Sequence, residues 1–159
     1  MICLAVCAAL CAVAQGNRIC VHDIEVARGA TVTVPVLLAN QDTTRGVQFR
    51  VTLPQGLTCQ EWNLAPRTER LGFILNNILK DGAHSVMIYQ VGRGAIPPGD
   101  EAIAIMTLQV DDTFTGGEIT VWKCRGSTMD NKSMEMDGST SSVTVPENCY
   151  FFDGAPSPD

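Results

Sequence analysis

The chain has few of the side chains on which catalysis usually depends. It has only two histidines, His22 and His84, and histidine is the side chain whose ordinary pKa lies near neutral pH. His22 is followed by Asp23, but successive residues of a strand point to opposite faces, so these two do not form a catalytic pair. No serine or cysteine lies in a Gly-x-Ser-x-Gly sequence, and the acidic residues, Glu61 among them, are scattered rather than paired as in a glycosidase. We therefore expect no enzyme activity and no cofactor.

Several binding patterns are also absent. There is no CxxC pair, and the wide spacing of Cys20, Cys59, Cys124 and Cys149 does not fit a zinc site. Residues 130–138 lack acidic side chains at alternate positions, so they do not form a calcium loop. No apolar run reaches the roughly 20 residues of a membrane span. The formal net charge is −6, and an acidic domain repels phosphate, so nucleic acid is not an expected partner.

Residues 1–14 are apolar throughout and end in Ala-Val-Ala, a small-x-small sequence of the signal-peptidase type. We predict a signal peptide over this range, and hence a secreted or cell-surface protein outside the cytoplasm. No lysine or arginine lies near the start, and a buried first strand or helix is the alternative. A lipoprotein would carry its lipid on Cys11, but Leu10 precedes this cysteine at a position where such sites have a small residue.

The length remaining after a signal peptide, about 145 residues, suits one domain. A chain of this size buries roughly two-thirds of its unfolded surface, so it needs no partner to fold. We assign residues 17–147 to this domain and residues 148–159 to a flexible C-terminal tail.

Residues 45–53 alternate between apolar and polar side chains, which predicts a strand with one face in a core and the other in water. The apolar set is Val47, Phe49, Val51 and Leu53, and the polar set is Gln48, Arg50 and Thr52. Pro54 ends the strand because it has no N–H to donate, and Gly56 allows the backbone to turn. A strand, a Pro-x-Gly corner and a second strand are typical of an antiparallel sandwich.

Further strands are predicted along the rest of the chain. Their ranges are 19–26, 30–39, 56–64, 85–91, 101–110, 118–124 and 141–145. Residues 67–83 fit either helical or strand spacing, and the turn sequences Asn76-Asn77 and Asp81-Gly82 favour a strand with a long loop. Residues 126–138 are polar and predict a loop. The pattern therefore predicts an all-β fold, a nine-stranded antiparallel two-sheet sandwich of the jelly-roll type.

The order and spacing of several motifs resemble cohesin-type domains, within the wider group of sandwiches that includes carbohydrate-binding modules. The motifs are DIEVARG at 23–29, VPVLLAN at 34–40, GVQF at 46–49, LPQGL at 53–57, VMIY at 86–89, PPG at 97–99 and FTGGEITV at 114–121. The resemblance covers roughly residues 19–146, and it depends on the order of all the motifs rather than on any one of them.

This resemblance implies a function. Cohesins have no catalytic residues and bind dockerins, which assembles surface complexes that degrade polysaccharides. A non-catalytic, cohesin-like module that binds a dockerin-like or other surface protein is therefore the expected function. The implied partner face is the outer face of the sheet that carries the third and sixth strands, with Gln48, Arg50 and Thr52 beside Met87 and Tyr89. Arg, Tyr and Met are enriched at protein interfaces.

Two other functions stay open. A carbohydrate-binding module would stack sugar rings on exposed aromatic side chains, and Trp62 and Trp122 are the candidates. Trp122 lies on the outer face if Ile119 and Val121 are core residues. The other alternative is a purely structural exported protein.

Four cysteines, Cys20, Cys59, Cys124 and Cys149, follow the predicted signal peptide, and an even number in an exported chain indicates two disulfides with three connectivities. The strand order of the resembled family places Cys20 and Cys124 at the same end of the sandwich. It therefore favours a Cys20–Cys124 bridge, and a Cys59–Cys149 bridge requires the tail to cross the sheet edge.

Overall fold

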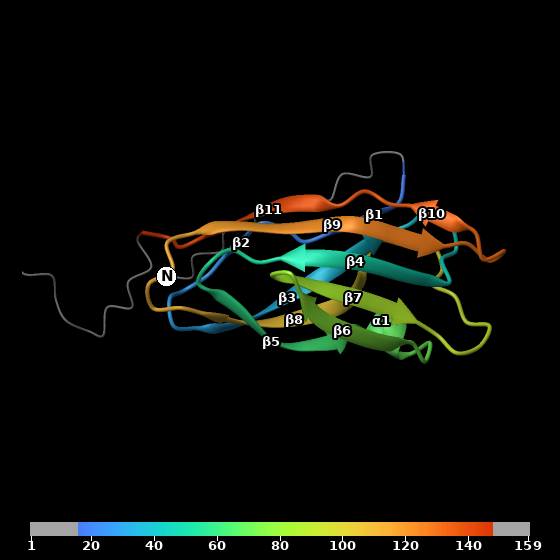
Figure 1. The fold of residues 1–159 in the computed structure, drawn as a ribbon, viewed down its shortest axis with the longest axis horizontal. Coiled ribbons are helices and arrows are strands. Elements are labelled where there is room, and N and C mark those ends of the chain that lie inside the picture. The colour runs from blue at the N-terminus through green and yellow to red at the C-terminus, as the bar shows by residue number, and fades with distance from the viewer. Residues whose placement is uncertain (1–15, 148–159) are drawn as a thin grey trace, which may run out of the picture.

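The computed structural model describes residues 16–147, which form two β-sheets packed face to face (Figure 1). The predicted signal peptide and the predicted C-terminal tail lie outside the described residues. The elements are β1 (Arg18–Cys20), β2 (Ile24–Glu25), β3 (Thr31–Ala39), β4 (Gly46–Thr52), β5 (Leu57–Leu64), α1 (Pro66–Glu69), β6 (Ile74–Lys80), β7 (Ala83–Tyr89), β8 (Ala102–Val110), β9 (Gly117–Ser127), β10 (Ser133–Glu135) and β11 (Ser139–Thr144). The predicted all-β sandwich is confirmed, with eleven strands in place of nine.

The two sheets differ in size. The small sheet has the strand order β1-β3-β8-β5, and the large sheet has the order β2-β11-β9-β4-β7-β6, with β10 paired to β9. Neighbouring strands are antiparallel except β11 and β2, which are parallel, with Val143 opposite Ile24. The last strand, β11, thus runs parallel to the early strand β2.

The alternation in β4 explains why this strand forms. Val47, Phe49 and Val51 are buried, whereas Gln48 and Thr52 are exposed, so one face of the strand lies against the small sheet. Each sheet contributes fully buried side chains to the core between them, among them Phe49, Ile88 and Ile119 from the large sheet and Val36, Met106 and Leu108 from the small sheet.

The predicted strand at residues 19–26 is two short strands in different sheets. The chain crosses from β1 in the small sheet to β2 in the large sheet. Side chains take the place of ladder hydrogen bonds at the crossing: the Ser139 hydroxyl accepts from the Val21 N–H at 3.3 Å, and the Asp23 carboxylate accepts from the Ser142 N–H at 2.8 Å. Alternation along a sequence does not report the sheet to which each residue belongs, so the pattern missed this crossing.

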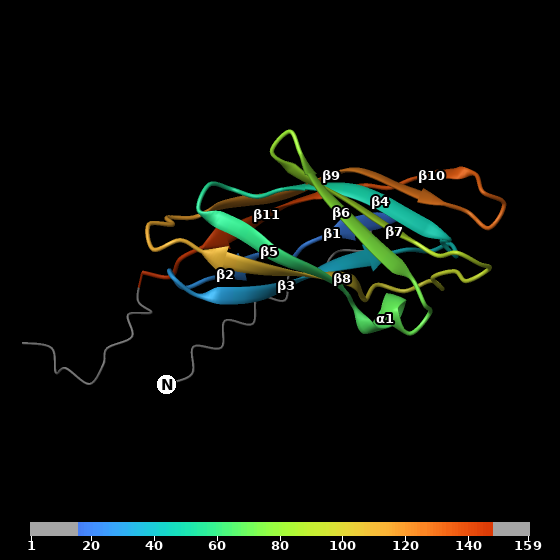
Figure 2. The same ribbon diagram turned by 60° about the horizontal axis from the view of Figure 1, so that its bottom comes forward.

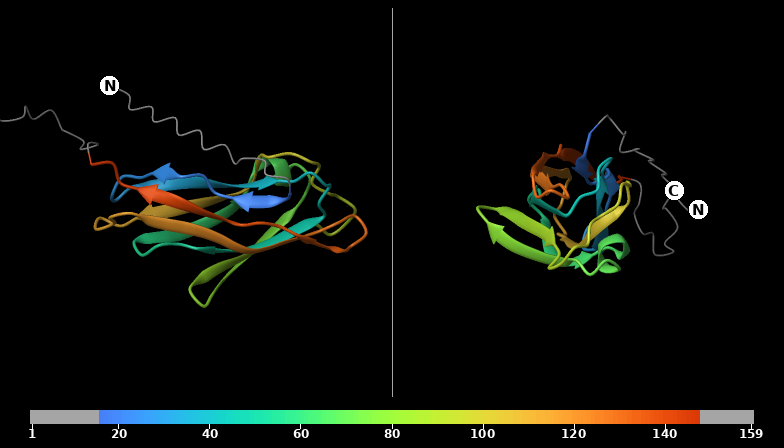
Figure 3. Two further views of the ribbon diagram at one scale, coloured as in Figure 1. Left: turned by 90° about the horizontal axis from the view of Figure 1, so that it is seen from above. Right: turned by 90° about the vertical axis from the view of Figure 1, so that its right-hand side faces the viewer.

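The prediction of a strand within residues 67–83 is confirmed, but the long loop is absent. The chain forms the four-residue α1 and then β6, so Asn76 and Asn77 lie inside a strand rather than in a turn. Asp81 and Gly82 connect β6 to β7, with φ angles of 53° and 74°. Positive φ at both central residues is typical of a type I′ hairpin turn. This hairpin projects obliquely from the body of the sandwich (Figures 2 and 3).

Both predicted disulfide bridges are wrong. Cys59 and Cys124 are free thiols, and although Cys20 is disulfide-bonded, neither of them is its partner. The prediction placed Cys124 at the end of a strand, whereas β9 continues to Ser127 and the Cys124 side chain is buried in the core. The Cys59 thiol donates to the Glu61 carbonyl in its own strand at 3.4 Å. Cys149 lies outside the described residues.

Segment 126–138, predicted as a polar loop, contains β10. Met134 is buried in this strand, and Met136 is buried just after it. Two methionines spaced by two residues were the signal for this strand.

Candidate protein-binding face

Four strands of the large sheet, in the order β9-β4-β7-β6, present their outer face away from the small sheet. The strand register brings the predicted partner-binding residues onto it: Gln48 lies opposite Met87, and Arg50 lies opposite Ser85. Thr52 follows in β4 and is exposed. Tyr89 lies opposite Ile74, and its hydroxyl accepts from the Asn76 amide at 3.1 Å. Gln48 thus lies beside Met87, while the direct neighbour of Arg50 in β7 is Ser85, and the role of these residues in binding stays a prediction.

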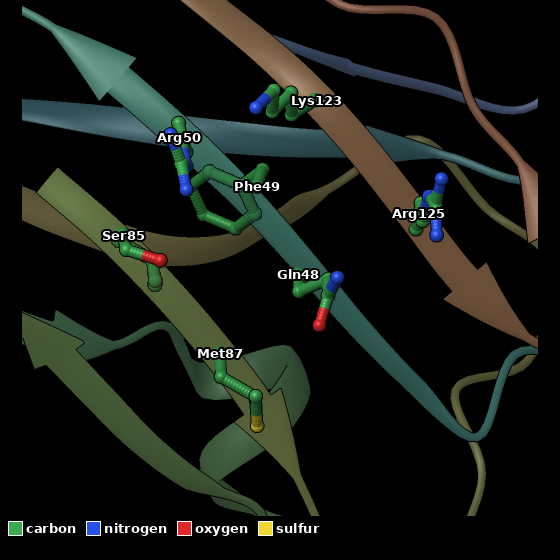
Figure 4. Close-up of a pocket in the computed structure, with 8 residues that line it drawn as sticks. Gln48, Phe49, Arg50, Ser85, Met87, Lys123 and Arg125 are labelled. Atoms are coloured by element: carbon green, nitrogen blue, oxygen red, sulfur yellow. The ribbon is translucent and has the colours of Figure 1, made fainter. Parts of the chain in front are cut away.

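A shallow hollow of about 410 Å³ lies on this outer face (Figure 4). Its lining comes from three strands: Gln48, Phe49 and Arg50 of β4, Ser85, Val86 and Met87 of β7, and Lys123 and Arg125 of β9. The lining includes three cations and no carboxylate. The chain as a whole has a formal charge of −6, so this concentration of positive charge runs against the balance of the protein.

The cations of β9 reach the hollow because of a β-bulge. Arg125 lies opposite Gln48 and Trp122 lies opposite Arg50, so two residues of β9 stand against one residue of β4. The extra residue is Lys123, with a φ angle of 49°. A non-glycine residue in this left-handed region costs about 1 kcal/mol or more, and such bulges are frequent where a side chain must be redirected.

The bulge changes which side chains face outward. Cys124 points into the core, while Lys123 and Arg125 are exposed beside the half-buried Trp122. Strict alternation from the buried Val121 would instead place Arg125 inside. Sequence reasoning missed both cations because β9 has no glycine at the bulge that could have signalled it.

The ring of Trp122 makes cation–π contacts with two of the cations, Arg50 and Lys123. The Arg50 guanidinium carbon and the Lys123 ammonium each lie 5.3 Å from the centroid of its ring. Its indole N–H donates to the Thr52 hydroxyl at 2.9 Å, which fixes the ring over β4. As predicted, Ile119 is buried and Trp122 lies on the outer face. The side chains of Arg50 and Lys123 therefore already lie beside the Trp122 ring.

The second predicted sugar-stacking residue, Trp62, lies elsewhere. It belongs to β5 of the small sheet and packs against the core, 6.2 Å from the Phe49 ring and 6.0 Å from the His84 ring between centroids. Its indole N–H is buried without a hydrogen-bond partner. Trp62 and Trp122 therefore do not share a surface on which a sugar chain could stack.

Apolar side chains lie on the same outer face, on the side away from the cations. Met87 of β7 is 45% exposed, and Ile74 and Ile78 of β6 are 41% and 66% exposed. Ile78 stands opposite Ser85 and Asn76 stands opposite Met87, so these residues share one surface. The sequence left the segment that holds Ile74 and Ile78 ambiguous between helix and strand spacing, so their face was not predicted. The Asp81-Gly82 turn was the signal that could have set their register.

Burial favours the neutral form of two thiols and one histidine within the fold. Burial, followed by the nearby charge of Asp137, raises the pKa of the Cys124 thiol to about 12, and burial also raises the pKa of Cys59. Burial lowers the pKa of His84, whose Nδ1 lies 3.3 Å from the Asn77 amide oxygen. Neither thiol is therefore a ready nucleophile.

Within residues 16–147, no group of three or more His, Cys, Asp or Glu side chains is arranged to hold a metal ion. None of the helices in this described part is long and apolar enough to cross a membrane.

Solved structures of cohesins share this fold. The type I cohesin OlpA of Clostridium thermocellum, solved with a dockerin, is 17% identical to this chain, with a TM-score of 0.69. The match covers 83% of this chain and 100% of the OlpA cohesin. The sixth cohesin of scaffoldin B from Acetivibrio cellulolyticus, also solved with a dockerin, is 16% identical with a TM-score of 0.66 and coverages of 83% and 100%. A non-cellulosomal cohesin from the archaeon Archaeoglobus fulgidus is 16% identical with a TM-score of 0.66 and coverages of 83% and 94%.

No protein-family model matches the sequence, and no curated protein matches it. At identities this low, similarity of structure shows a shared fold rather than a shared partner. We conclude that residues 16–147 form a cohesin-like domain, a two-sheet β-sandwich with the fold of the cohesins.

Proposed function

We propose that this chain is a secreted or cell-surface binding module without catalytic activity, and that it recognises a protein partner through the outer face of β9, β4, β7 and β6. The observation that carries the proposal is the composition of this face. It combines exposed Met87 and Ile78 with Arg50 and Tyr89, and Met, Tyr and Arg are enriched at protein interfaces.

The structural neighbours support a protein partner, because two of the cohesins named above were solved in complex with dockerins. A dockerin-like domain or another surface protein is the partner that we propose, in an assembly that acts on polysaccharides. The apolar signal-like segment at residues 1–14 supports export. Catalysis is not part of the proposal, because burial raises the pKa of the half-buried Cys59 thiol and of the buried Cys124 thiol, and no acidic partner is seen for the histidines within the described residues.

A carbohydrate ligand is less well supported. Trp122 is flanked by Arg50 and Lys123, and Trp62 lies in the other sheet, so the two rings do not form a platform. A glycan array in which strong signals disappear in Trp122→Ala would favour the carbohydrate function over the protein function.

The proposal is tested by capture from the surface fraction of the source organism with the immobilised full chain. We expect Tyr89→Ala and Arg50→Ala each to weaken capture of the principal partner about tenfold, because central Arg and Tyr residues dominate interface energies. Thr33→Ala is the matched control, since Thr33 is exposed on the outer face of the small sheet. If Tyr89→Ala and Arg50→Ala both leave capture unchanged, the partner does not bind through the outer face of the large sheet.

A further inference from the structure

We propose that the partner inserts an acidic side chain into the hollow between Arg50, Lys123 and Arg125, and rests an apolar side chain on Met87, Ile74 or Ile78. This inference deepens the proposed function and rests on it. It specifies a partner segment in which a carboxylate and an apolar group stand a fixed distance apart.

Charge complementarity is the first argument. Three cations line one hollow of a protein whose formal charge is −6, and no Asp or Glu lines it. Gln48 and Ser85 add polar groups to its floor. Glu135 of β10 stands opposite Arg125 but does not line the hollow, whereas Arg50 stands opposite Ser85 and Trp122. A hollow whose charged lining residues are all cations favours an anion, and arginine binds a carboxylate through two parallel hydrogen bonds.

The β-bulge is the second argument, because it is what assembles the cations. The left-handed Lys123 directs its own side chain outward, and it also restores Arg125 to the outer face. Bulges of this kind redirect side chains next to functional sites. The Trp122 ring, held by Thr52, then keeps Arg50 and Lys123 beside the hollow before any partner arrives.

The arrangement of strands fixes the spacing of the partner's groups. The cations belong to β9 and β4, while the exposed isoleucines belong to β6, beyond β7. Adjacent strands lie roughly 4.8 Å apart, so two strand spacings separate Arg50 from Ile78 by about 10 Å. A helix rises ~1.5 Å per residue, so an acidic residue about seven positions from an apolar residue spans this distance.

An acidic polysaccharide is the competing occupant, and the apolar side chains argue against it. A uronic acid chain carries carboxylates but no aliphatic side chain to cover Met87 and Ile78, which are 45% and 66% exposed on the same face. A protein segment provides both the carboxylate and the apolar contact.

The test uses a pair of synthetic helical peptides of roughly 15 residues. One carries a Glu about seven positions before a Leu, and its twin has Gln in place of the Glu. Backbone NMR of the isotope-labelled full chain follows binding at low salt. We expect the Glu peptide to perturb amides of β4, β7 and β9, and the Gln peptide to bind about tenfold more weakly.

Matched variants sharpen the test. Lys123→Gly removes a cation and is compatible with the positive φ of the bulge, so it should weaken the Glu peptide without unfolding the protein. Arg125→Gln should do the same. Arg70→Gln changes the net charge equally, but Arg70 is exposed after α1 and outside the hollow, so it should leave binding unchanged.

Two outcomes would overturn the inference. The first is that the two peptides bind equally or that neither binds. The second is that polygalacturonate binds the hollow in their place, which would identify an acidic polysaccharide as the occupant.

Capture of the native partner separates this inference from the proposed function. If capture depends on Tyr89 but not on Lys123 or Arg125, the acidic anchor fails and the protein-binding function stands. If capture depends on none of the three, both fail.

Discussion

The outer faces of the two sheets differ in chemistry although both belong to the same sandwich. On the small sheet, strand pairing aligns Thr33 with Thr107 and Glu61, and Thr31 with Gln109. These are polar side chains with one carboxylate, and the exposed Pro35 and the half-buried Ile105 form the next pair on the same face. On the large sheet, Arg50, Lys123 and Arg125 surround a hollow beside Met87 and the isoleucines of β6.

This difference teaches that the fold alone does not set the function of a face. A sheet face that is exposed only to water needs mainly polar side chains, and threonine, glutamine and glutamate side chains provide them on the small sheet. The large sheet instead keeps a left-handed lysine and 66%-exposed Ile78, neither of which stabilises the isolated domain. Features that cost stability and gather on one face favour a role in binding.

The two tryptophans give the largest contrast in stability. Trp62→Ala removes a ring that packs against the core between the sheets, and we expect it to lower the free energy of unfolding by about 3 kcal/mol. Trp122→Ala removes a ring from the outer face and should cost about 1 kcal/mol, while it weakens partner binding by releasing Arg50 and Lys123. Urea unfolding and binding assays on both variants measure the two effects. Equal losses of stability would contradict the separation of the two sites.

Matched aspartate substitutions test the two faces directly. Met87→Asp introduces a charge at the centre of the candidate interface, and we expect partner binding to weaken by about 2 kcal/mol, roughly thirtyfold. Thr33→Asp makes the corresponding change on the small sheet, and binding should stay within about twofold. Titration calorimetry with the captured partner provides the measurement. A larger loss of partner binding in Thr33→Asp than in Met87→Asp would contradict the assignment of the binding site to the large sheet.

Substitutions at Lys123, in the bulge of β9, should change the free energy of unfolding by less than Trp62→Ala does. Lys123→Val places a β-branched side chain at a φ angle of 49° and should destabilise the domain by about 1 kcal/mol relative to Lys123→Gly. Glycine adopts this conformation without strain. Thermal unfolding of the two variants is the measurement, and a Val variant as stable as the Gly variant would show that the bulge is not present in solution.

The smallest effect concerns pH at the junction of the sheets, where His84 of β7 faces Trp62 of β5. Burial lowers the pKa of His84 below its ordinary value of 6.5, so the unfolded chain binds a proton more readily than the folded chain. His84 therefore makes no contribution above pH 6.5, and the free energy of unfolding falls as the pH drops from 6.5 towards the lower folded pKa. His84→Gln should remove part of this decline in urea titrations between pH 7 and 5; an unchanged decline would show that His84 is solvated.

Short-range patterns predicted much of the fold. The alternation of β4 identified its buried and exposed faces, and the motif order indicated the cohesin-like sandwich. Gln48 was therefore expected on the same face as Met87, which is its cross-strand partner. The crossing at Val21, the bulge at Lys123 and the free thiol of Cys124 were missed. Each depends on contacts between residues far apart in the chain. The cation hollow could not be predicted because one extra residue in β9 reverses which side chains face outward.

Protection of methionines from oxidation tests the central claim most directly. Met87 is 45% exposed on the outer face of the large sheet, and Met129 is 50% exposed in the turn after β9, so dilute peroxide should oxidise both in the free protein. With the partner bound, we predict that Met87 is protected and that Met129 is oxidised at its original rate, as followed by peptide mass spectrometry. Oxidation of Met87 at an unchanged rate in the complex would contradict the assignment of this face as the binding site.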